Sequence, residues 1–168
     1  MFETERCFIN TFKKTDYADV KKLFVNQDVR KYLGGIREED SIQEEMNDML
    51  NPSDHSFYWV VREKQFDTFI GLVSLDPHHD GSYLEISYQL LPIWWGKGYA
   101  TEVVKRIIHY ALTELNLTKV VAETQTANKS SCRLLERVGM EFERTIVRFG
   151  AEQAIYSIKS SYKSKPYS

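Results

Sequence analysis

The sequence predicts a single α/β domain with a mixed β-sheet. The chain has 168 residues, the usual size of one domain, and no repeat or linker divides it. Three strand-like runs joined by short turns indicate an antiparallel meander in its middle. A long helical pattern then separates two strand-like runs, which predicts a parallel pair joined by a crossover connection.

The first third predicts one strand and two helices. Residues 6–12 alternate as a strand does, and Thr15 or Asp16 would cap a helix with the apolar stripe of TDYADVKKLFVN. The segment from Ser41 has the Ser-x-x-Glu spacing of a capping box. We therefore expect a second helix from Ser41 to about Leu50.

The middle of the chain contains the meander and the longest helix. Its expected strands are SFYWVVRE, DTFIGLVSL and YLEISYQLL. From Thr101 to Leu115 the apolar residues recur at helical spacing, with Glu102 among the residues left for solvent, and Asn116 suits a left-handed stop. This helix would connect the third of these strands to the next.

The last third predicts a strand, a helix and two more strands. LTKVVAETQT is rich in β-branched residues, Asn128 would cap a helix that ends at Gly139, and FERTIVRFG and QAIYSIKS read as strands. The polar residues 160–168 are expected to fray. In all we expect a mixed central sheet of about seven strands with about four helices in one domain over residues 1–168.

Charge and hydropathy exclude several classes of partner. Twenty-two basic and 24 acidic residues are interspersed and give a net charge of −2, so we expect no nucleic-acid partner. No run approaches the ~18 apolar residues of a membrane-spanning helix, and the first residues lack the apolar core of a secretion signal. We expect a cytoplasmic protein without a membrane partner.

Metal binding is not indicated either. Cys7 and Cys132 both fall in apolar segments, which favours free thiols at least half-buried over a disulfide or metal site. His78 and His79 are adjacent in the turn-like stretch DPHHDG, but neighbouring residues rarely bind one metal. We expect a solvated loop there and no metal.

The segment most informative about chemistry is YLEISYQLLPIWWGKGYATEVV. A strand ends at Pro92, and a turn containing Gly96 and Gly98 leads into the long helix. Glycines allow a tight backbone approach, and the start of a helix offers unpaired N–H groups to a phosphate. Alternatively, Gly98 only allows close packing of helix on strand. The Walker pattern is absent, and Thr101 stands where the dinucleotide pattern needs glycine.

Two separated motifs carry a family resemblance. GKGYATEVV and the later NKSSCRLLERVGM resemble the GNAT acetyltransferase superfamily, specifically the Rim-type branch of ribosomal-protein N-terminal acetyltransferases. TERCFINTF and DTFIGLVSL agree with that branch, so the likeness spans about Thr4 to Lys159. It implies a GNAT-like fold with a V-shaped splay between the fourth and fifth strands. It also implies acetyl transfer from acetyl-CoA to a primary amine, by a monomer or homodimer.

The resemblance also implies the cofactor-binding residues. Pantetheine would lie in the splay, pair with the backbone of Gln89, Leu90 and Leu91, and receive an N–H for the oxyanion from Leu90. Asn128 and Ser131 would face the pantetheine and the sulfur, although Asn128 can also be a plain helix cap and Ser131 a helix filler. The turn that would hold the pyrophosphate comprises Trp95, Gly96, Lys97, Gly98, Tyr99, Ala100 and Thr101.

Two catalytic residues are candidates. Glu85 interrupts an apolar strand and could accept the proton of the amine, although a solvent-facing glutamate or a water chain are alternatives. An α-amino group, with a pKa of about 7.7–8.0, needs less help than a lysine at about 10.4. Ser131 could donate a proton to the leaving thiolate, because Leu135 stands where many relatives have a tyrosine. Ile93, where many have Gln or Arg, is a lesser departure.

Three functions remain open from the sequence. The preferred one is transfer of an acetyl group to a protein N-terminus or to a small amine such as a polyamine or antibiotic. The second is a non-catalytic acyl-CoA-binding or regulatory module, because the tyrosine of the late helix is missing. The third is an anion-binding domain for another phosphorylated ligand, which would use only the glycine turn.

Overall fold

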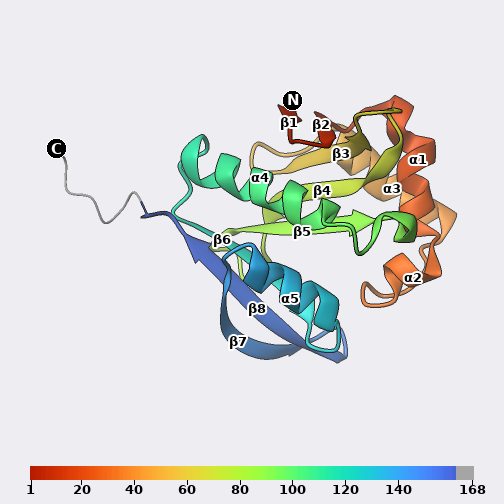
Figure 1. Cartoon of the computed structure of the whole chain (residues 1–168). Helices are drawn as coiled ribbons and strands as arrows, with labels where there is room; N and C mark the ends of the chain where they lie inside the picture. The colour runs from red at the N-terminus through yellow and green to blue at the C-terminus, as the bar shows by residue number, and fades with distance from the viewer. Residues whose placement is uncertain (162–168) are drawn as a thin grey trace.

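The computed structural model describes residues 1–161; residues 162–168, most of the tail expected to fray, lie outside the described part. The described residues form eight strands and five α-helices (Figure 1). The strands are β1 (Phe2–Glu3), β2 (Cys7–Thr11), β3 (Phe57–Glu63), β4 (Phe69–Pro77), β5 (Leu84–Leu90), β6 (Lys119–Gln125), β7 (Glu141–Arg148) and β8 (Ala151–Lys159). The helices are α1 (Tyr17–Phe24), α2 (Gln27–Arg30), α3 (Glu39–Leu50), α4 (Tyr99–Thr113) and α5 (Lys129–Arg137), with short 3-10 turns at Lys14–Asp16 and Pro92–Trp94.

All strands join one mixed sheet. Their order is β1-β2-β3-β4-β5-β6-β8-β7, and β5–β6 is the one parallel pair within residues 1–161. That pair has only two matched positions, Leu84 with Val120 and Glu85 with Val121. Beyond them the strands diverge, as Figure 1 shows. This confirms the mixed sheet. It also confirms the splay, because β5 and β6 are the fourth and fifth of the strands predicted from the sequence.

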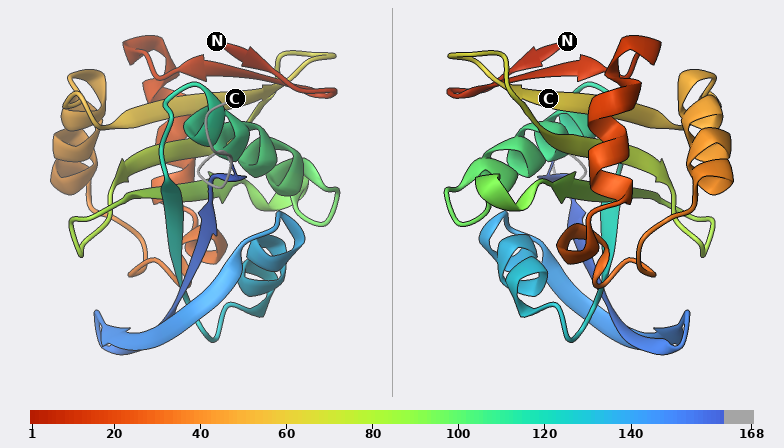
Figure 2. Two further views of the ribbon diagram at one scale, coloured as in Figure 1. Left: turned by 90° about the vertical axis from the view of Figure 1, so that its left-hand side faces the viewer. Right: turned by 90° about the vertical axis from the view of Figure 1, so that its right-hand side faces the viewer.

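The helices cover the two faces of the sheet separately (Figure 2). α4 and α5 pack on one face over a core that contains Val104, Ile107 and Leu135. α1, α2 and α3 pack on the other, where Leu23 and Met46 are fully buried. Each helix therefore turns one apolar stripe to the sheet, which is how an amphipathic helix is stabilised in a small domain. Among residues 1–161, no helix has the length and apolarity needed to cross a membrane.

Several signals at helix ends are confirmed. Asn128 caps α5 by accepting a hydrogen bond from the Ser131 N–H. Asn116 follows α4 with a positive φ of 55°, and Gly139 follows α5 with a φ of 97°. The N–H groups of Gly139 and Met140 bond back to carbonyls of α5, which is the expected glycine stop.

Both cysteines are free thiols.

The start of α3 was predicted wrongly. The helix begins at Glu39, so Ser41 lies inside it rather than capping it. Glu39 and Asp40 occupy the first turn, where acidic side chains favour the positive end of the helix. The Ser41 hydroxyl instead accepts hydrogen bonds from the Arg37 guanidinium.

The short elements β1 and α2 were not expected from the sequence and account for the additional strand and helix.

Gly71 on β4 allows the end of β5 to approach unusually closely. A Cβ atom at this position would lie 2.1 Å from the Gln89 carbonyl oxygen and 2.9 Å from Leu90 Cα. Both neighbours are backbone atoms and cannot turn aside. Glycine is therefore required at this position for β5 to adopt its backbone path next to the splay.

We predict that Gly71→Ala lowers the free energy of unfolding by about 1–3 kcal/mol or more, since the added methyl overpacks a backbone contact. Urea unfolding measures this change. Gly150→Ala is the control, because its φ is 74° but its added Cβ would meet no atom within 4 Å. Gly150→Ala pays only the cost of its positive φ, and an unchanged free energy of unfolding in Gly71→Ala would show that the close approach at Gly71 carries no cost.

Candidate active site

A cavity of about 900 Å³ occupies the splay. It is bounded by β5 and β6, by the starts of α4 and α5, and by the segment from α2 to Leu33 on the other side of the sheet. The cavity therefore reaches through the sheet where the two strands have parted. Its volume lies in the upper part of the range for sites that bind cofactors and other small molecules.

The glycine turn forms one end of this cavity. Gly96 and Gly98 have positive φ values of 71° and 83°, and Gly98 is the residue before the first turn of α4. In the described part of the chain, no side chain caps this end of the helix. The N–H groups of the first turn have no acceptor within a helix, and here they border a cavity. A 15-residue helix also places a partial positive charge at this point.

An ion pair from the start of the chain holds the turn. Arg6 Nε donates to Glu102 Oε1 at 2.8 Å, and Arg6 NH1 donates to the Lys97 carbonyl at 2.9 Å. The Arg6 guanidinium also stacks on the Tyr99 ring, 3.9 Å from its centroid. The Thr4 hydroxyl donates to Glu102 as well. The expectation that Glu102 is left for solvent was therefore wrong, because helical periodicity does not show what a distant strand places beside the helix.

The two tryptophans of the turn are anchored by their indole N–H groups. Trp94 Nε1 donates to the Phe69 carbonyl at 3.1 Å, and Trp95 Nε1 donates to the Leu90 carbonyl at 2.8 Å. Both residues line the cavity, although about half of the Trp95 surface is exposed. The indoles thus fix the path between the end of β5 and the start of α4.

Basic side chains surround the same end of the cavity. Lys129, Arg133 and Arg137 of α5 line it, and Arg137 NH1 donates to the Thr101 hydroxyl at 3.1 Å. The cations of α5 and the start of α4 favour an anionic ligand at this end. Lys31 also lines the cavity, but it follows α2 on the opposite face of the sheet.

The end of β5 divides its backbone groups between the sheet and the splay. The Leu91 N–H donates to the Ile70 carbonyl at 3.0 Å, and the Leu91 carbonyl accepts from the Trp94 N–H at 2.9 Å. Both backbone groups of Leu91 therefore have a partner within the protein, although its carbonyl oxygen can accept a second hydrogen bond. Neighbouring residues of a strand direct their backbone groups to opposite sides, so the Leu90 N–H faces the splay.

A tyrosine that the sequence analysis did not single out lines the cavity. The Tyr88 hydroxyl is 2.5 Å from the Ser131 hydroxyl oxygen, and both residues line the cavity. Burial raises the pKa of Tyr88 to about 12, so its hydroxyl is neutral at physiological pH. Leu135 also lines the cavity but offers no polar group. Alternation along β5 could have indicated Tyr88, because it shares a face with Ile86 and Leu90.

Glu85 is mostly buried rather than exposed to solvent. The pKa of its carboxyl is raised to about 8: burial is the largest cause, the charges of Asp76 and Glu123 add to the shift, and a hydrogen bond from the Glu123 backbone and the charge of Arg148 oppose it. The carboxyl lies at the last matched position of β5 and β6, where the splay begins. A carboxyl with this pKa can exchange a proton near neutral pH.

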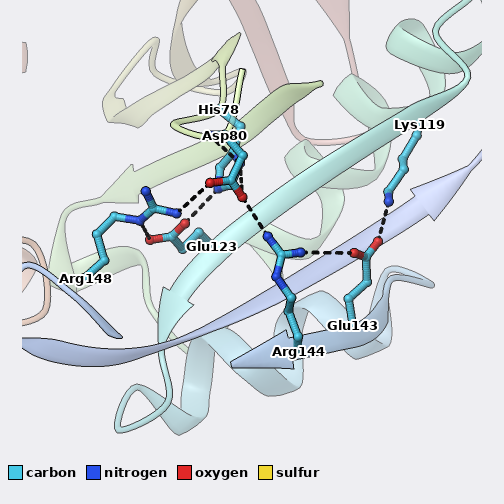
Figure 3. A network of polar contacts seen from close by, with 7 residues as sticks. All are labelled: His78, Asp80, Lys119, Glu123, Glu143, Arg144 and Arg148. Carbon is cyan, nitrogen blue, oxygen red and sulfur yellow. Dashed lines mark hydrogen bonds and ion pairs between the residues drawn. The ribbon is translucent and has the colours of Figure 1, made fainter. Parts of the chain in front are cut away.

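Glu123, whose charge acts on Glu85, belongs to a network of ion pairs and hydrogen bonds (Figure 3). His78 Nε2 lies 2.7 Å from Glu123 Oε1, and Arg148 Nε donates to Glu123 Oε2 at 3.0 Å. Asp80 accepts from Arg148 and Arg144, which ties the turn after β4 to β7. The expectation of a solvated loop here was wrong for His78, which is 5% exposed. The whole network comprises His78, Asp80, Lys119, Glu123, Glu143, Arg144 and Arg148.

The structure brings most of the residues singled out from the sequence to the one cavity. Those that line it are Gln89, Leu90, Trp95, Gly96, Gly98, Tyr99, Ala100, Thr101, Asn128 and Ser131. Lys97, Leu91 and Glu85 do not line it. The Lys97 side chain instead lies over the Trp94 ring, 5.7 Å from the ring centroid.

Comparison with known proteins agrees with this geometry. The acetyltransferase (GNAT) domain family matches residues 6–141. The protein YkkB of Bacillus subtilis is 27% identical over 94% of this chain and 94% of its own length.

Two solved structures have the same fold. Spermidine N-acetyltransferase of Vibrio cholerae, in complex with CoA and spermine, has a TM-score of 0.81 at 22% identity and covers 92% of this chain and 96% of its own. Ribosomal-protein-S5-alanine acetyltransferase of Vibrio fischeri has a TM-score of 0.80 at 20% identity and covers 98% of both chains. At such identities these two likenesses show the fold alone.

The mixed sheet, its splay and the family match together define an enzyme that transfers acyl groups. The chain belongs to the GNAT acetyltransferase family and is an acetyl-CoA-dependent N-acetyltransferase. The Rim-type branch is not distinguished, because the structural neighbours include both a polyamine and a ribosomal-protein acetyltransferase.

Proposed function

We propose that this N-acetyltransferase binds acetyl-CoA in the cavity of the splay and transfers the acetyl group directly to a primary amine that enters from the opposite face of the sheet. The observation that carries the proposal is the uncapped start of α4, which borders a cavity running through the parted strands. Phosphate binding at one end and amine access at the other require this continuous passage.

The turn of residues 95–101 would hold the pyrophosphate. Its backbone N–H groups and the positive end of α4 match two phosphates, and the cations of α5 lie beside them. Lys97 would contribute through its backbone, because its side chain lies over Trp94 outside the cavity. Asn128 would position α5 mainly as its cap.

The thioester would lie at the end of β5. The Leu90 N–H, which faces the splay, could donate to the thioester oxygen as negative charge develops there. The Gln89 side chain and the Leu90 backbone would also contact the pantetheine arm, which would run along β5 much as a further strand does. This placement brings the sulfur next to the Tyr88 and Ser131 hydroxyls.

Proton transfers would use residues on either side of the reacting carbon. The amine nitrogen forms a bond to the carbonyl carbon, the carbon–sulfur bond breaks, and the nitrogen loses a proton while the sulfur gains one. Glu85 would accept the first proton through water, since it does not itself line the cavity. Tyr88, coupled to Ser131, would supply the second. Tyr88 would thus act as the proton donor in place of the tyrosine that many relatives have at the position of Leu135.

The phosphate turn is tested by thermal melting with acetyl-CoA, CoA and ATP. At a hundred times its dissociation constant, acetyl-CoA or CoA is expected to raise the melting temperature by ~5–10 °C, and ATP by much less. Gly98→Trp should abolish the CoA shift, because the indole fills the turn. Gly81→Trp, at a φ of 79° in the turn between β4 and β5, should retain it. An undiminished shift in Gly98→Trp would remove the turn as the phosphate site.

Glu85 is tested by the pH dependence of kcat/KM. A general base must be deprotonated, so the wild-type value should rise with pH through the pKa of about 8. Glu85→Gln should lose this step and fall by about 100-fold or more, leaving only the ionisation of the amine itself. Glu152→Gln, an exposed position of β8, should match the wild type. An unchanged profile in the Glu85→Gln variant would exclude Glu85 as the base.

Tyr88 is tested by removing its hydroxyl. Tyr88→Phe should lower kcat by about 100-fold while the KM for acetyl-CoA stays similar, because the thiolate loses its proton donor. Ser131→Ala should have a smaller effect. The double variant should be no worse than Tyr88→Phe if the two hydroxyls act as one unit. Additive losses would mean that the two residues act independently.

A further inference from the structure

A second, smaller cavity opens on the face of the sheet that carries α1–α3. Its volume is about 210 Å³, and it lies between β3, β4 and β5 on one side and α1, α3 and Leu33 on the other. It shares Leu33 and residues 87–89 with the large cavity. The two cavities therefore meet at the strand along which the thioester is proposed to lie.

The polar groups of this small cavity are suited to a cation. Its lining contains two carboxylates, Glu45 and Asp76, and no lysine, arginine or histidine. Glu85 lies opposite Asp76 in the strand register. Glu45 pairs with Arg37, but neither Asp76 nor Glu85 has an ion-pair partner among residues 1–161. Asp76 thus lines the small cavity without an ion pair, and Glu85, which does not line it, is its neighbour across the strand pair.

A separate observation points to a missing hydrogen-bond donor. The Gln89 side-chain oxygen is buried and has no hydrogen-bond partner within residues 1–161, and Gln89 lines both cavities. An unpaired buried acceptor costs about 1–3 kcal/mol, so such a group is normally satisfied by a ligand or water. An ammonium group would supply donors to this oxygen and to the carboxylates. The apolar walls, Phe24, Met49 and Leu72, suit an aliphatic chain.

We propose that the acceptor is a small aliphatic amine with a second, protonated nitrogen, which Asp76 and Glu45 hold in this cavity while the first nitrogen is acetylated. The proposal rests on the function proposed above. The cavity has the volume of about seven waters at ~30 Å³ each, which suits a short diamine better than a protein terminus with its peptide groups. Burial raises the pKa of Asp76 and the charge of Glu45 adds to the shift, while the charge of His79 and a hydrogen bond with Tyr58 oppose it.

The acetylation step balances as for any primary amine. The uncharged nitrogen bonds to the thioester carbon, the carbon–sulfur bond breaks, and the proton released by nitrogen offsets the proton taken up by sulfur. The second nitrogen stays protonated throughout and forms no covalent bond. Its role is to bind the substrate and to direct the reacting nitrogen toward the splay.

The test compares two amines with the same reacting group, 1,5-diaminopentane and pentylamine. We expect kcat/KM to be at least about 10-fold higher for the diamine, beyond the factor of two from its two equivalent ends, as one charged hydrogen bond would give. Asp76→Asn should reduce this ratio toward two; because the charge of Asp76 also acts on the pKa of Glu85 and so on the rate with either amine, the ratio of the two values is the quantity compared. Glu45→Gln should reduce it as well.

Glu44→Gln is the matched control, because Glu44 is an exposed carboxylate beside Glu45 on α3 and does not line the cavity. It should keep the wild-type ratio. If Asp76→Asn does not fold, the wild-type ratio and Glu45→Gln still decide the outcome.

Two results would overturn the inference while the acetyltransferase mechanism stands: equal use of both amines, or preferred acetylation of a short peptide with a free α-amino group. Failure of the proposed function would look different, because no primary amine would be acetylated and CoA would not raise the melting temperature. In that case, calorimetry with 1,5-diaminopentane tests the cavity directly, and an absence of binding overturns the inference too.

Discussion

The short contact between β5 and β6 is the constraint on which the rest of the site depends. Two matched positions hold the strands together, and beyond them neither strand completes its hydrogen bonds with the other. Backbone groups left unpaired inside a protein are costly unless something satisfies them. The proposed acetyl-CoA supplies that partner at the Leu90 side of the opening. The same opening joins the two faces of the sheet and lets an amine reach the thioester.

Much of this arrangement could be predicted from the sequence, because its signals are local. The glycine turn, the Asn128 cap and the Gly139 stop each act within a few residues, and the crossover helix shows that its flanking strands are parallel. The family resemblance then implied one fold in which these local features occur together. Ser41 is the position where a local signal gave a wrong prediction, because its spacing fits a capping box. The Ser41 hydroxyl instead accepts a hydrogen bond from Arg37, and the helix begins at the acidic residues before Ser41.

The features that the sequence could not show depend on contacts between distant segments. The Arg6–Glu102 pair joins residues 96 positions apart. Tyr88 on β5 contacts Ser131 on α5, and these two elements are separated in the sequence by α4 and β6. The same holds for Asp76, because its position on a strand does not predict that α3 packs opposite it. Periodicity indicates which face a residue lies on but not which residue lies opposite.

The attachment of Arg6 to the glycine turn links the very start of the chain to a segment near residue 100. β1 and β2 form the outer edge of the sheet, and edge elements open locally more readily than the core does. When this edge frays, Glu102 and the Lys97 carbonyl lose their common partner, and the turn before α4 loses its outer support. The rigidity of the turn is therefore set in part by the first few residues, so an extension or a truncation at the N-terminus acts on it directly.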